Sequence, residues 1–309
     1  MITAIKKFKE LVDPEKTRVE SLFPLVLVFG GDADIKNGRH SSCRNVFLHW
    51  ASENKFALED SLRIPEQFKE WNSFEGYSNL VDFEKEAGCL TRGILLFSES
   101  PGALAELGAF CTDETLCERL VVVIAKEHYD VPYFISLGPI KRIEYKHGEG
   151  GICVVNATKD NKLHAELFET EVDGVGETLL EKVNTLPKTQ QFLSQEIRNK
   201  YLLIADLVEL FGALTETEIG ILLSHWKIDS NDLKRMLNLL VLFEQIHRVP
   251  IKNSRYYISP KQRTRFLDYT ATAGSKFERA SFRLLNTLPE LKKEKNRLDA
   301  YASLHGVPR

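Results

Sequence analysis

Short, fully apolar runs alternate with amphipathic segments through the first 187 residues of the chain. Apolar side chains at consecutive positions are typical of strands that are covered on both faces of a parallel sheet. Five runs are interpreted as such strands: 25–29, 94–97, 119–125, 133–137 and 151–155. Helical spacing predicts the segments between them: the first twenty or so residues, 41–54, 77–88, 101–110 and a helix ending near Pro187. The alternation predicts an α/β fold with a doubly wound, Rossmann-like parallel sheet.

The pattern changes after Pro187, where the fully apolar strands stop. Three helices and then two strands are expected in this order: 201–211, 216–226, 231–243, 244–249 and 255–259. Thr215 and Glu218 have the spacing of a capping box at the start of the second helix. Three helices followed by a two-stranded ribbon is the order of a winged helix-turn-helix. The chain is therefore divided into domains 1–187 and 188–309, the second of which ends in a helical tail.

The stretch 93–110 joins a buried strand to the start of a helix. Ser100 supplies a helix N-cap, and a proline follows it at the first helical position. Glu106 lies among small residues along one side of this helix: Gly102, Ala103, Ala105, Gly108 and Ala109. Open parallel sheets bind ligands in the crevice beyond the carboxyl ends of their strands. We therefore expect the Glu106 carboxylate to face that crevice; the other interpretation is a buried ion pair with an arginine such as Arg92.

Gly30, Gly31 and Asp32 come directly after the first predicted strand. Two glycines let the backbone turn sharply near a phosphate or a ribose, and Asp32 could accept sugar hydroxyls, although the same residues also form ordinary tight turns. Basic side chains follow nearby: Arg39, His40 and Arg44. Within helix 77–88, Glu84 is the acidic residue expected to point toward the site. The aromatic and polar segment 65–76 is expected to cover the crevice.

The net charge of −3 conceals an asymmetry between the two predicted domains. Residues 1–187 contain 21 basic and 31 acidic residues, whereas residues 188–309 contain 20 basic and 13 acidic residues. An excess of positive charge in the second half favours an anionic partner. Within 248–283, nine basic residues are interleaved with aromatic ones, which suits phosphate contacts and stacking on unpaired bases. Winged helices also serve as docking or dimerisation modules, so a protein partner stays open.

The five cysteines are scattered through apolar surroundings without paired spacing. An odd number in this arrangement indicates reduced core thiols, and it suggests no metal site. No run approaches the roughly 20 apolar residues of a membrane helix, and the first residues lack a signal-peptide pattern. We therefore expect a cytoplasmic protein that has no membrane partner.

The residues from Phe97 to Phe110 also carry a family resemblance. They read Phe-Ser-Glu-Ser-Pro-Gly-Ala-Leu-Ala-Glu-Leu-Gly-Ala-Phe, and they are preceded by Val28-Phe-Gly-Gly-Asp32 and followed by Gly138-Pro139. This combination resembles the effector proteins of bacterial retrons that join a nucleoside deoxyribosyltransferase-like domain to a winged-helix domain. The resemblance covers essentially the whole chain in domain order, and the stretch 97–110 is its most specific part.

The resemblance implies an anti-phage toxin that cleaves the N-glycosidic bond of NAD and needs no other cofactor. It implies that Glu106 is the catalytic carboxylate. It also implies nucleotide-holding loops formed by these residues: Gly30, Gly31, Asp32, Ser98, Glu99, Ser100 and Gly102. The implied partners are a retron reverse transcriptase and its multicopy single-stranded DNA with the associated RNA, in a higher-order complex. For Glu99 a second interpretation stands, because a carboxylate beside a helix N-terminus is stabilised there without any catalytic role.

The chemistry of glycosidic cleavage agrees with a single essential carboxylate. Breaking the bond from the sugar C1′ to a base builds positive charge on the sugar, which one anionic carboxylate can stabilise or attack. Nicotinamide leaves from a cationic nitrogen and needs no strong acid, and the chain shows no obvious second carboxylate of the deoxyribosyltransferase base-binding pattern. Two alternatives stay open: a nucleoside deoxyribosyltransferase or nucleotide N-glycosidase, and a non-catalytic nucleotide sensor that regulates DNA binding.

Overall fold

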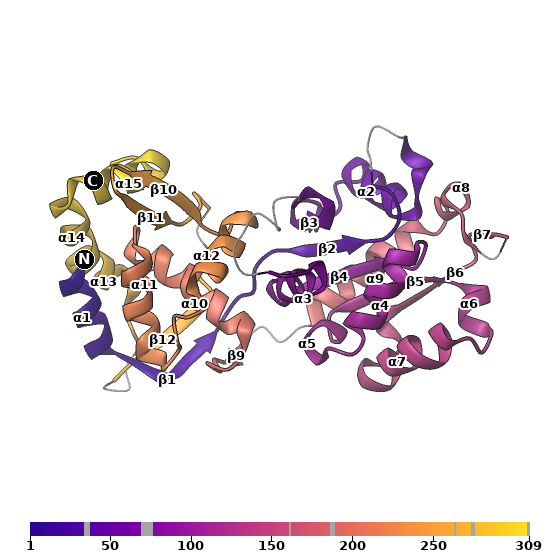
Figure 1. The fold of residues 1–309 in the computed structure, drawn as a ribbon, viewed down its shortest axis with the longest axis horizontal. Coiled ribbons are helices and arrows are strands. Elements are labelled where there is room, and N and C mark those ends of the chain that lie inside the picture. The colour runs from indigo at the N-terminus through magenta and orange to yellow at the C-terminus, as the bar shows by residue number, and fades with distance from the viewer. Residues whose placement is uncertain are drawn as a thin grey trace. The chain divides into compact units, whose positions relative to one another are not determined.

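The computed structural model describes residues 1–33, 38–68, 77–160, 162–185, 189–262, 264–272 and 276–307. These residues form two compact units, which Figure 1 shows with their elements labelled. The α/β unit contains 24–68 and 77–185, and the C-terminal unit contains 189–307 together with 1–23. Within the described ranges, no helix combines the length and the apolar character needed to cross a membrane.

A five-stranded parallel sheet forms the centre of the α/β unit. Its strands have the order β3-β2-β4-β5-β6, where β3 is Leu62–Arg63, β2 is Val26–Phe29, β4 is Gly93–Phe97, β5 is Leu120–Ala125 and β6 is Ile152–Val155. The four pairings between neighbours are all parallel. Strands β2, β4 and β5 are buried at every position, as their uninterrupted apolar sequences predict. The predicted parallel sheet is thus confirmed, and four of its strands lie where the sequence places them.

The strand predicted at 133–137 is wrong. Residues Ser136–Ile140 form a single π-helical turn that leads into α7 (Lys141–His147), and α6 (Lys126–Asp130) precedes it. Phe134 is 85% exposed and Leu137 is 60% exposed, so the described part of the chain leaves these apolar side chains uncovered. A short apolar run cannot be assigned to strand or helix by periodicity alone, which accounts for the error.

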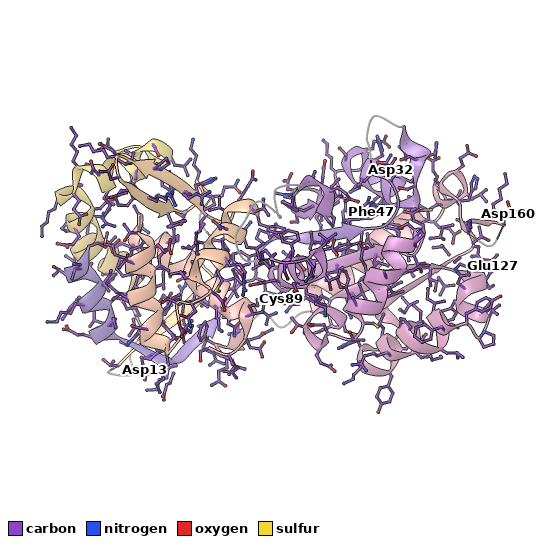
Figure 2. The ribbon with its side chains drawn as sticks, in the orientation of Figure 1. Asp13, Asp32, Phe47, Cys89, Glu127 and Asp160 are labelled. Carbon is purple, nitrogen blue, oxygen red and sulfur yellow. The ribbon has the colours of Figure 1, made fainter. Side chains whose placement is uncertain are left out.

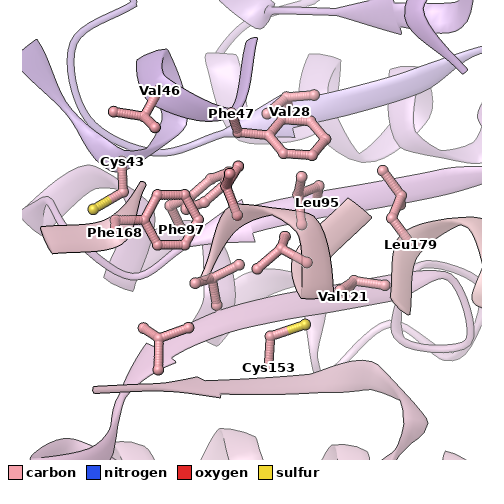
Figure 3. Packing of buried hydrophobic residues seen from close by; sticks show 14 of the residues in the cluster. Val28, Cys43, Val46, Phe47, Leu95, Phe97, Val121, Cys153, Phe168 and Leu179 are labelled. Atoms are coloured by element: carbon pink, nitrogen blue, oxygen red, sulfur yellow. The ribbon is translucent and has the colours of Figure 1, made fainter. Parts of the chain in front are cut away.

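Helices cover both faces of the sheet. On one face, β2, β4 and β5 pack with α2 (Cys43–Glu53), α8 (Ala165–Phe168) and α9 (Val172–Thr185), and Figure 3 shows this cluster around Phe97. On the other face, Phe29 contacts Phe110 at the end of α4 (Pro101–Phe110), with a ring-centroid distance of 5.0 Å. The remaining helices of the unit are α3 (Leu80–Leu90) and α5 (Glu114–Cys117), and a short hairpin joins β7 (Thr158–Lys159) to β8 (Lys162–Leu163).

The C-terminal unit is mainly helical. Its elements after residue 196 include α10 (Ile197–Phe211), α11 (Glu216–Leu223), α12 (Leu233–Leu242), the hairpin of β10 (His247–Ile251) and β11 (Ser254–Ile258), α13 (Arg279–Phe282), α14 (Leu288–Lys293) and α15 (Lys295–His305). The three expected helices and the ribbon are therefore present in the predicted order. Thr215 and Glu218 form the predicted capping box at the start of α11.

The first 23 residues belong to this second unit. Residues Ile2–Leu11 form α1, but Val12–Val19 form β1 instead of continuing the expected helix. Strand β1 is the central strand of a three-stranded antiparallel sheet with β12 (Leu267–Ala271) and β9 (Gln190–Gln191). Phe8 of α1 is fully buried among aromatic rings of the same unit. The division at 187/188 itself lies outside the described residues, and the structure groups 1–23 with the later segment.

The aromatic residues between 248 and 283 were expected to stack on unpaired bases, and that expectation is wrong. All six side chains are 7% exposed or less: Tyr256, Tyr257, Phe266, Tyr269, Phe277 and Phe282. Three of the nine basic residues also form ion pairs within the chain: Arg279 with Asp206 and Glu209, Arg283 with Glu209, and Arg265 with Glu20 and Asp268. The aromatic side chains of this stretch are therefore part of the core, and Arg279 and Arg283 belong to a buried ionic network.

Candidate functional site

Two predicted loops meet at the carboxyl edge of the parallel sheet. Strand β2 ends at Phe29 and is followed by the Gly30–Gly31 turn, while β4 ends at Phe97 and is followed by Ser98, Glu99 and Ser100. The two strands are paired in parallel register, with Phe29 opposite Leu96. Parallel neighbours end at the same edge, so the structure brings these two loops together where open α/β sheets bind ligands.

The glycine turn is closely packed against protein atoms. A Cβ atom added to Gly30 would lie 2.9 Å from the Glu99 carboxylate and 3.0 Å from the Cβ of Phe97. At Gly31 an added Cβ would lie 2.9 Å from the Cβ of Ser42. These contacts require glycine because real Cβ atoms essentially never approach so closely. The two glycines thus allow the loops after β2 and β4 to touch.

Glu99 joins the glycine turn to the start of α2. Its carboxylate accepts hydrogen bonds from the backbone N–H groups of Gly31 (2.8 Å), Cys43 (2.7 Å) and Arg44 (3.0 Å). The last two donors are the first N–H groups of α2, and the N-terminus of a helix attracts anions. The Glu99 carboxylate thus occupies the place at the N-terminus of α2 where a bound anion could otherwise lie. This agrees with the interpretation of Glu99 as a carboxylate that is stabilised by a helix N-terminus without a catalytic role.

The other loop residues fix the backbone. Ser100 caps α4 by accepting from the Ala103 N–H, and its hydroxyl donates to the Gly30 carbonyl at 3.2 Å. The Ser98 hydroxyl donates to the carbonyl of Val123 in β5. Asp32, labelled in Figure 2, is exposed, and its carbonyl accepts from the Ser42 hydroxyl at 2.6 Å. Gly102 is exposed in the first turn of α4, and among the described residues the atom nearest to its Cβ position is the Ser100 hydroxyl oxygen at 3.8 Å.

An acidic cavity of about 300 Å³ lies beside this junction. We call it the acid cavity, and its lining is Phe29, Gly30, Arg44, Pro65, Glu66, Phe68, Leu80, Glu84 and Glu106. Glu106 from α4 and Glu84 from α3 both line it, as their positions in the sequence predict. Pro65, Glu66 and Phe68 also line it, as expected for a covering segment, whereas 69–76 lie outside the described residues. Glu66 is a third carboxylate that lines this cavity, and the sequence pattern alone does not identify it.

Burial perturbs the carboxyl groups of the acid cavity. Desolvation raises the pKa of Glu106 to about 7, the charge of Glu66 raises it further, and Arg44 opposes both effects. Desolvation likewise raises the pKa of Glu84 to about 8, with repulsion from Glu106 and Glu66 adding to it. At neutral pH, Glu84 therefore keeps its proton and Glu106 is about half ionised. Two neighbouring groups with different protonation states are typical of catalytic sites.

Arg44 provides the positive charge of the acid cavity. The side chain is 2% exposed, and its guanidinium donates to both carboxylate oxygens of Glu66, at 2.7 and 3.0 Å. It also donates to the carbonyls of Val28 and Gly31, which ties the end of β2 to α2. The sequence suggested that this arginine offers charge to a phosphate; in the structure it holds the turn and Glu66. Arg39 and His40, suggested for the same purpose, both pair with Glu169.

A Glu84→Gln variant is expected to gain stability relative to the wild type as pH rises. The folded-state pKa of Glu84 is raised, so its contribution to stability is complete below about pH 4.5 and is lost as pH rises through about 8. Glutamine does not ionise, and the difference in the free energy of unfolding should therefore grow by about 2–4 kcal/mol between pH 5 and pH 9. Urea denaturation at both pH values measures it. Exposed Glu181 of α9, changed to glutamine, is the control, and an equal pH response in both variants would contradict the buried ionisation.

Comparisons with known proteins place the chain among retron proteins. The model of the STM3845 retron effector protein family matches residues 40–248, which include Glu84, Glu99 and Glu106. The chain is 26% identical over 197 residues to the "Retron Ec73 putative ribosyltransferase/DNA-binding protein" of Escherichia coli, covering 58% of this chain and 60% of that protein. It is 28% identical over 136 residues to the "Retron Ec86 putative ribosyltransferase/DNA-binding protein" of Escherichia coli, covering 44% of this chain and 42% of that protein. The matches thus span less than two thirds of either relative.

Proposed function

The chain belongs to the STM3845 retron effector protein family, and we propose that it hydrolyses the N-glycosidic bond of NAD as the toxic effector of an anti-phage retron. The observation that carries this proposal is the position of Glu106, a half-buried carboxylate in a cavity at the ligand-binding edge of a parallel sheet. The ribosyltransferase named in both Escherichia coli relatives supports glycosyl chemistry at this edge.

In the proposed reaction, the bond from the ribose C1′ to the nicotinamide nitrogen breaks, and its electron pair neutralises the pyridinium ring. The positive charge that develops on the sugar is stabilised by ionised Glu106, which either shields it or forms a transient bond to C1′. Water supplies the new oxygen on C1′ and gives up one proton. Neutral Glu84 can donate a hydrogen bond to a sugar oxygen, because it keeps its proton at neutral pH.

The proposal is tested by incubating the purified full chain with NAD and separating the products by chromatography. We expect nicotinamide and ADP-ribose to appear in equal amounts. Intact NAD after incubation with the full chain alone and with its retron partners would overturn the assignment, and a fall in cellular NAD on expression would support it.

The acid cavity also favours a second candidate. The sequence shows no obvious second carboxylate for base recognition, yet Glu84 lines the same cavity as Glu106, and desolvation raises its pKa to about 8. A neutral purine or pyrimidine must gain a proton as it leaves, and Glu84 could donate one. This observation favours a nucleoside deoxyribosyltransferase or a nucleotide N-glycosidase. Parallel incubations with deoxynucleosides and nucleotides distinguish these activities by showing which substrate loses its base.

For the C-terminal unit we propose a winged-helix fold that binds the single-stranded DNA of the retron. Helices α10 to α12 precede the β10–β11 hairpin, which exposes three basic side chains: Arg248, Lys252 and Arg255. Exposed Lys234 lies on α12. The DNA-binding function named in both relatives supports this proposal. We further propose that the reverse transcriptase, the DNA and its RNA hold the effector inactive in a higher-order assembly in the cytoplasm.

An Arg255→Ala variant is expected to bind single-stranded DNA more weakly, with a salt dependence reduced by about 0.7 in the log–log slope, because one phosphate contact is lost. Fluorescence anisotropy over a salt series measures both quantities. Exposed Lys6 of α1, changed to alanine, serves as the control for the loss of one charge. An unchanged slope for Arg255→Ala would place the DNA elsewhere. If nucleotides altered DNA affinity without being consumed, the chain would instead act as a sensor.

A further inference from the structure

A second cavity adjoins the acid cavity across the glycine turn. Its volume is about 460 Å³, and we call it the polar cavity; its lining is Gly31, Asp32, His40, Ser41, Ser42, Glu99, Lys162, Leu163, His164, Ala165 and Glu166. Gly30 lines the acid cavity and Gly31 lines the polar cavity. Adjacent Cα atoms are about 3.8 Å apart, so one turn of backbone separates the two spaces.

We propose that the polar cavity binds the adenylate half of NAD while the acid cavity binds the nicotinamide riboside half. This inference rests on the proposed function. The acid cavity, at about 300 Å³, is at the small end of the range of ligand pockets, which is roughly 300–1,000 Å³. It suits one nucleoside, and a dinucleotide with two nucleoside halves requires a second space next to it. The polar cavity is the adjacent space on the same edge of the sheet.

The lining of the polar cavity has the chemistry of a ribose and phosphate site. Asp32 and Glu166 are exposed carboxylates that can accept ribose hydroxyls. Lys162 of β8 is exposed and supplies an ammonium group for a phosphate. His164 has a buried Nδ1 atom that lacks a hydrogen-bond partner within the described part of the chain. Buried polar atoms are normally hydrogen-bonded, and a ligand bound in this cavity would supply a hydrogen-bond partner for His164.

The position of Glu99 leaves the phosphate to side-chain donors of the polar cavity, of which Lys162 carries the ammonium group. In many nucleotide-binding sheets the first helix N-terminus holds the phosphate, but here the Glu99 carboxylate already accepts the N–H groups of Cys43 and Arg44. The amide donors of α2 are therefore not free for a ligand anion. The β7–β8 hairpin brings Lys162 to the same side of the turn, which replaces the usual helix contact with a side chain.

The first test measures binding of AMP to the full chain carrying Glu106→Gln, by calorimetry, so that turnover plays no part. Adding Lys162→Ala is expected to weaken AMP binding at least tenfold. The matched control is Lys159→Ala, because Lys159 is the cross-strand partner of Lys162 and does not line the cavity; its effect should stay within twofold. Failure of AMP to bind, or equal effects of the two lysine changes, would overturn the inference.

The second test compares NAD with nicotinamide riboside, which lacks the adenylate half, in the otherwise unaltered chain. Lys162→Ala should lower kcat/KM for NAD about tenfold and leave the value for nicotinamide riboside unchanged. A bulky side chain, Ala165→Phe, should act in the same way by filling the polar cavity. Equal losses on both substrates would overturn the inference. If AMP binding depends on Lys162 but NAD is not consumed, the inference of an adenylate site is supported and only the proposed hydrolysis is overturned.

Discussion

A Glu106→Gln variant is expected to release nicotinamide from NAD at least about a thousandfold more slowly than the wild type. Glutamine keeps the size of the side chain but removes the negative charge that would face the sugar C1′. NAD should still bind, because the other residues of the cavity are unchanged. The loss of rate should therefore appear in kcat. Quenched time courses analysed by chromatography measure the rate, and thermal unfolding confirms that the fold is retained.

The pH profile provides an independent check on the same residue. Because the pKa of Glu106 is raised to about 7, the reactive anion is lost on acidification, and kcat/KM should fall about tenfold per pH unit below pH 7. Exposed Glu177 of α9, changed to glutamine, is the matched control and should alter neither the rate nor the profile. Retained turnover in Glu106→Gln would show that another group performs the chemistry.

An Asp206→Ala variant is expected to lower the free energy of unfolding of the C-terminal unit by about 3–5 kcal/mol, because it removes one of the two carboxylates that pair with Arg279 and leaves buried donors without an acceptor. The Asp206 side chain is fully buried and accepts from the N–H groups of Phe266 and Leu267, the hydroxyl of Tyr269 and the guanidinium of Arg279. One carboxylate thus connects α10 to β12 and α13.

Urea denaturation of the full chain, followed by the fluorescence of Trp226 in the same unit, measures the loss. Asp299 on α15 is exposed, and its change to alanine should cost less than about 0.5 kcal/mol, as surface substitutions usually do. A loss below about 1 kcal/mol for Asp206→Ala would mean that the buried network contributes specificity rather than stability.

The sheet could be predicted from sequence because its central strands are apolar at every position, as strands covered on both faces of a parallel sheet are. Strand β3 has only two residues, and β12 alternates buried and half-buried positions, so neither stood out. The error at 133–137 arose because burial, which the sequence does not report, distinguishes a strand from an exposed helical turn. The aromatic residues after 248 were misread for the same reason.

At the candidate site, the glycine turn could be located because it directly follows a strand end, and Glu106 because it lies on the helix that follows the next predicted strand. Glu66 could not, because its place in the acid cavity depends on its contact with Arg44, 22 residues away in the chain. The hydrogen bonds of Glu99 span 55 to 68 residues and were equally hidden. That these hydrogen bonds hold two loops together can be recognised only in the folded structure.

Strand β1 carries a practical consequence for dissecting the protein. Residues 1–23 belong to the C-terminal unit, and the chain returns to that unit near residue 189 after forming the α/β unit. The α/β unit is therefore inserted into the sequence of the C-terminal unit and is joined to it by two covalent connections. A fragment starting at residue 188 would lack the middle strand of a three-stranded sheet and should aggregate through its unpaired edges. Expression of an isolated α/β unit should begin at Pro24.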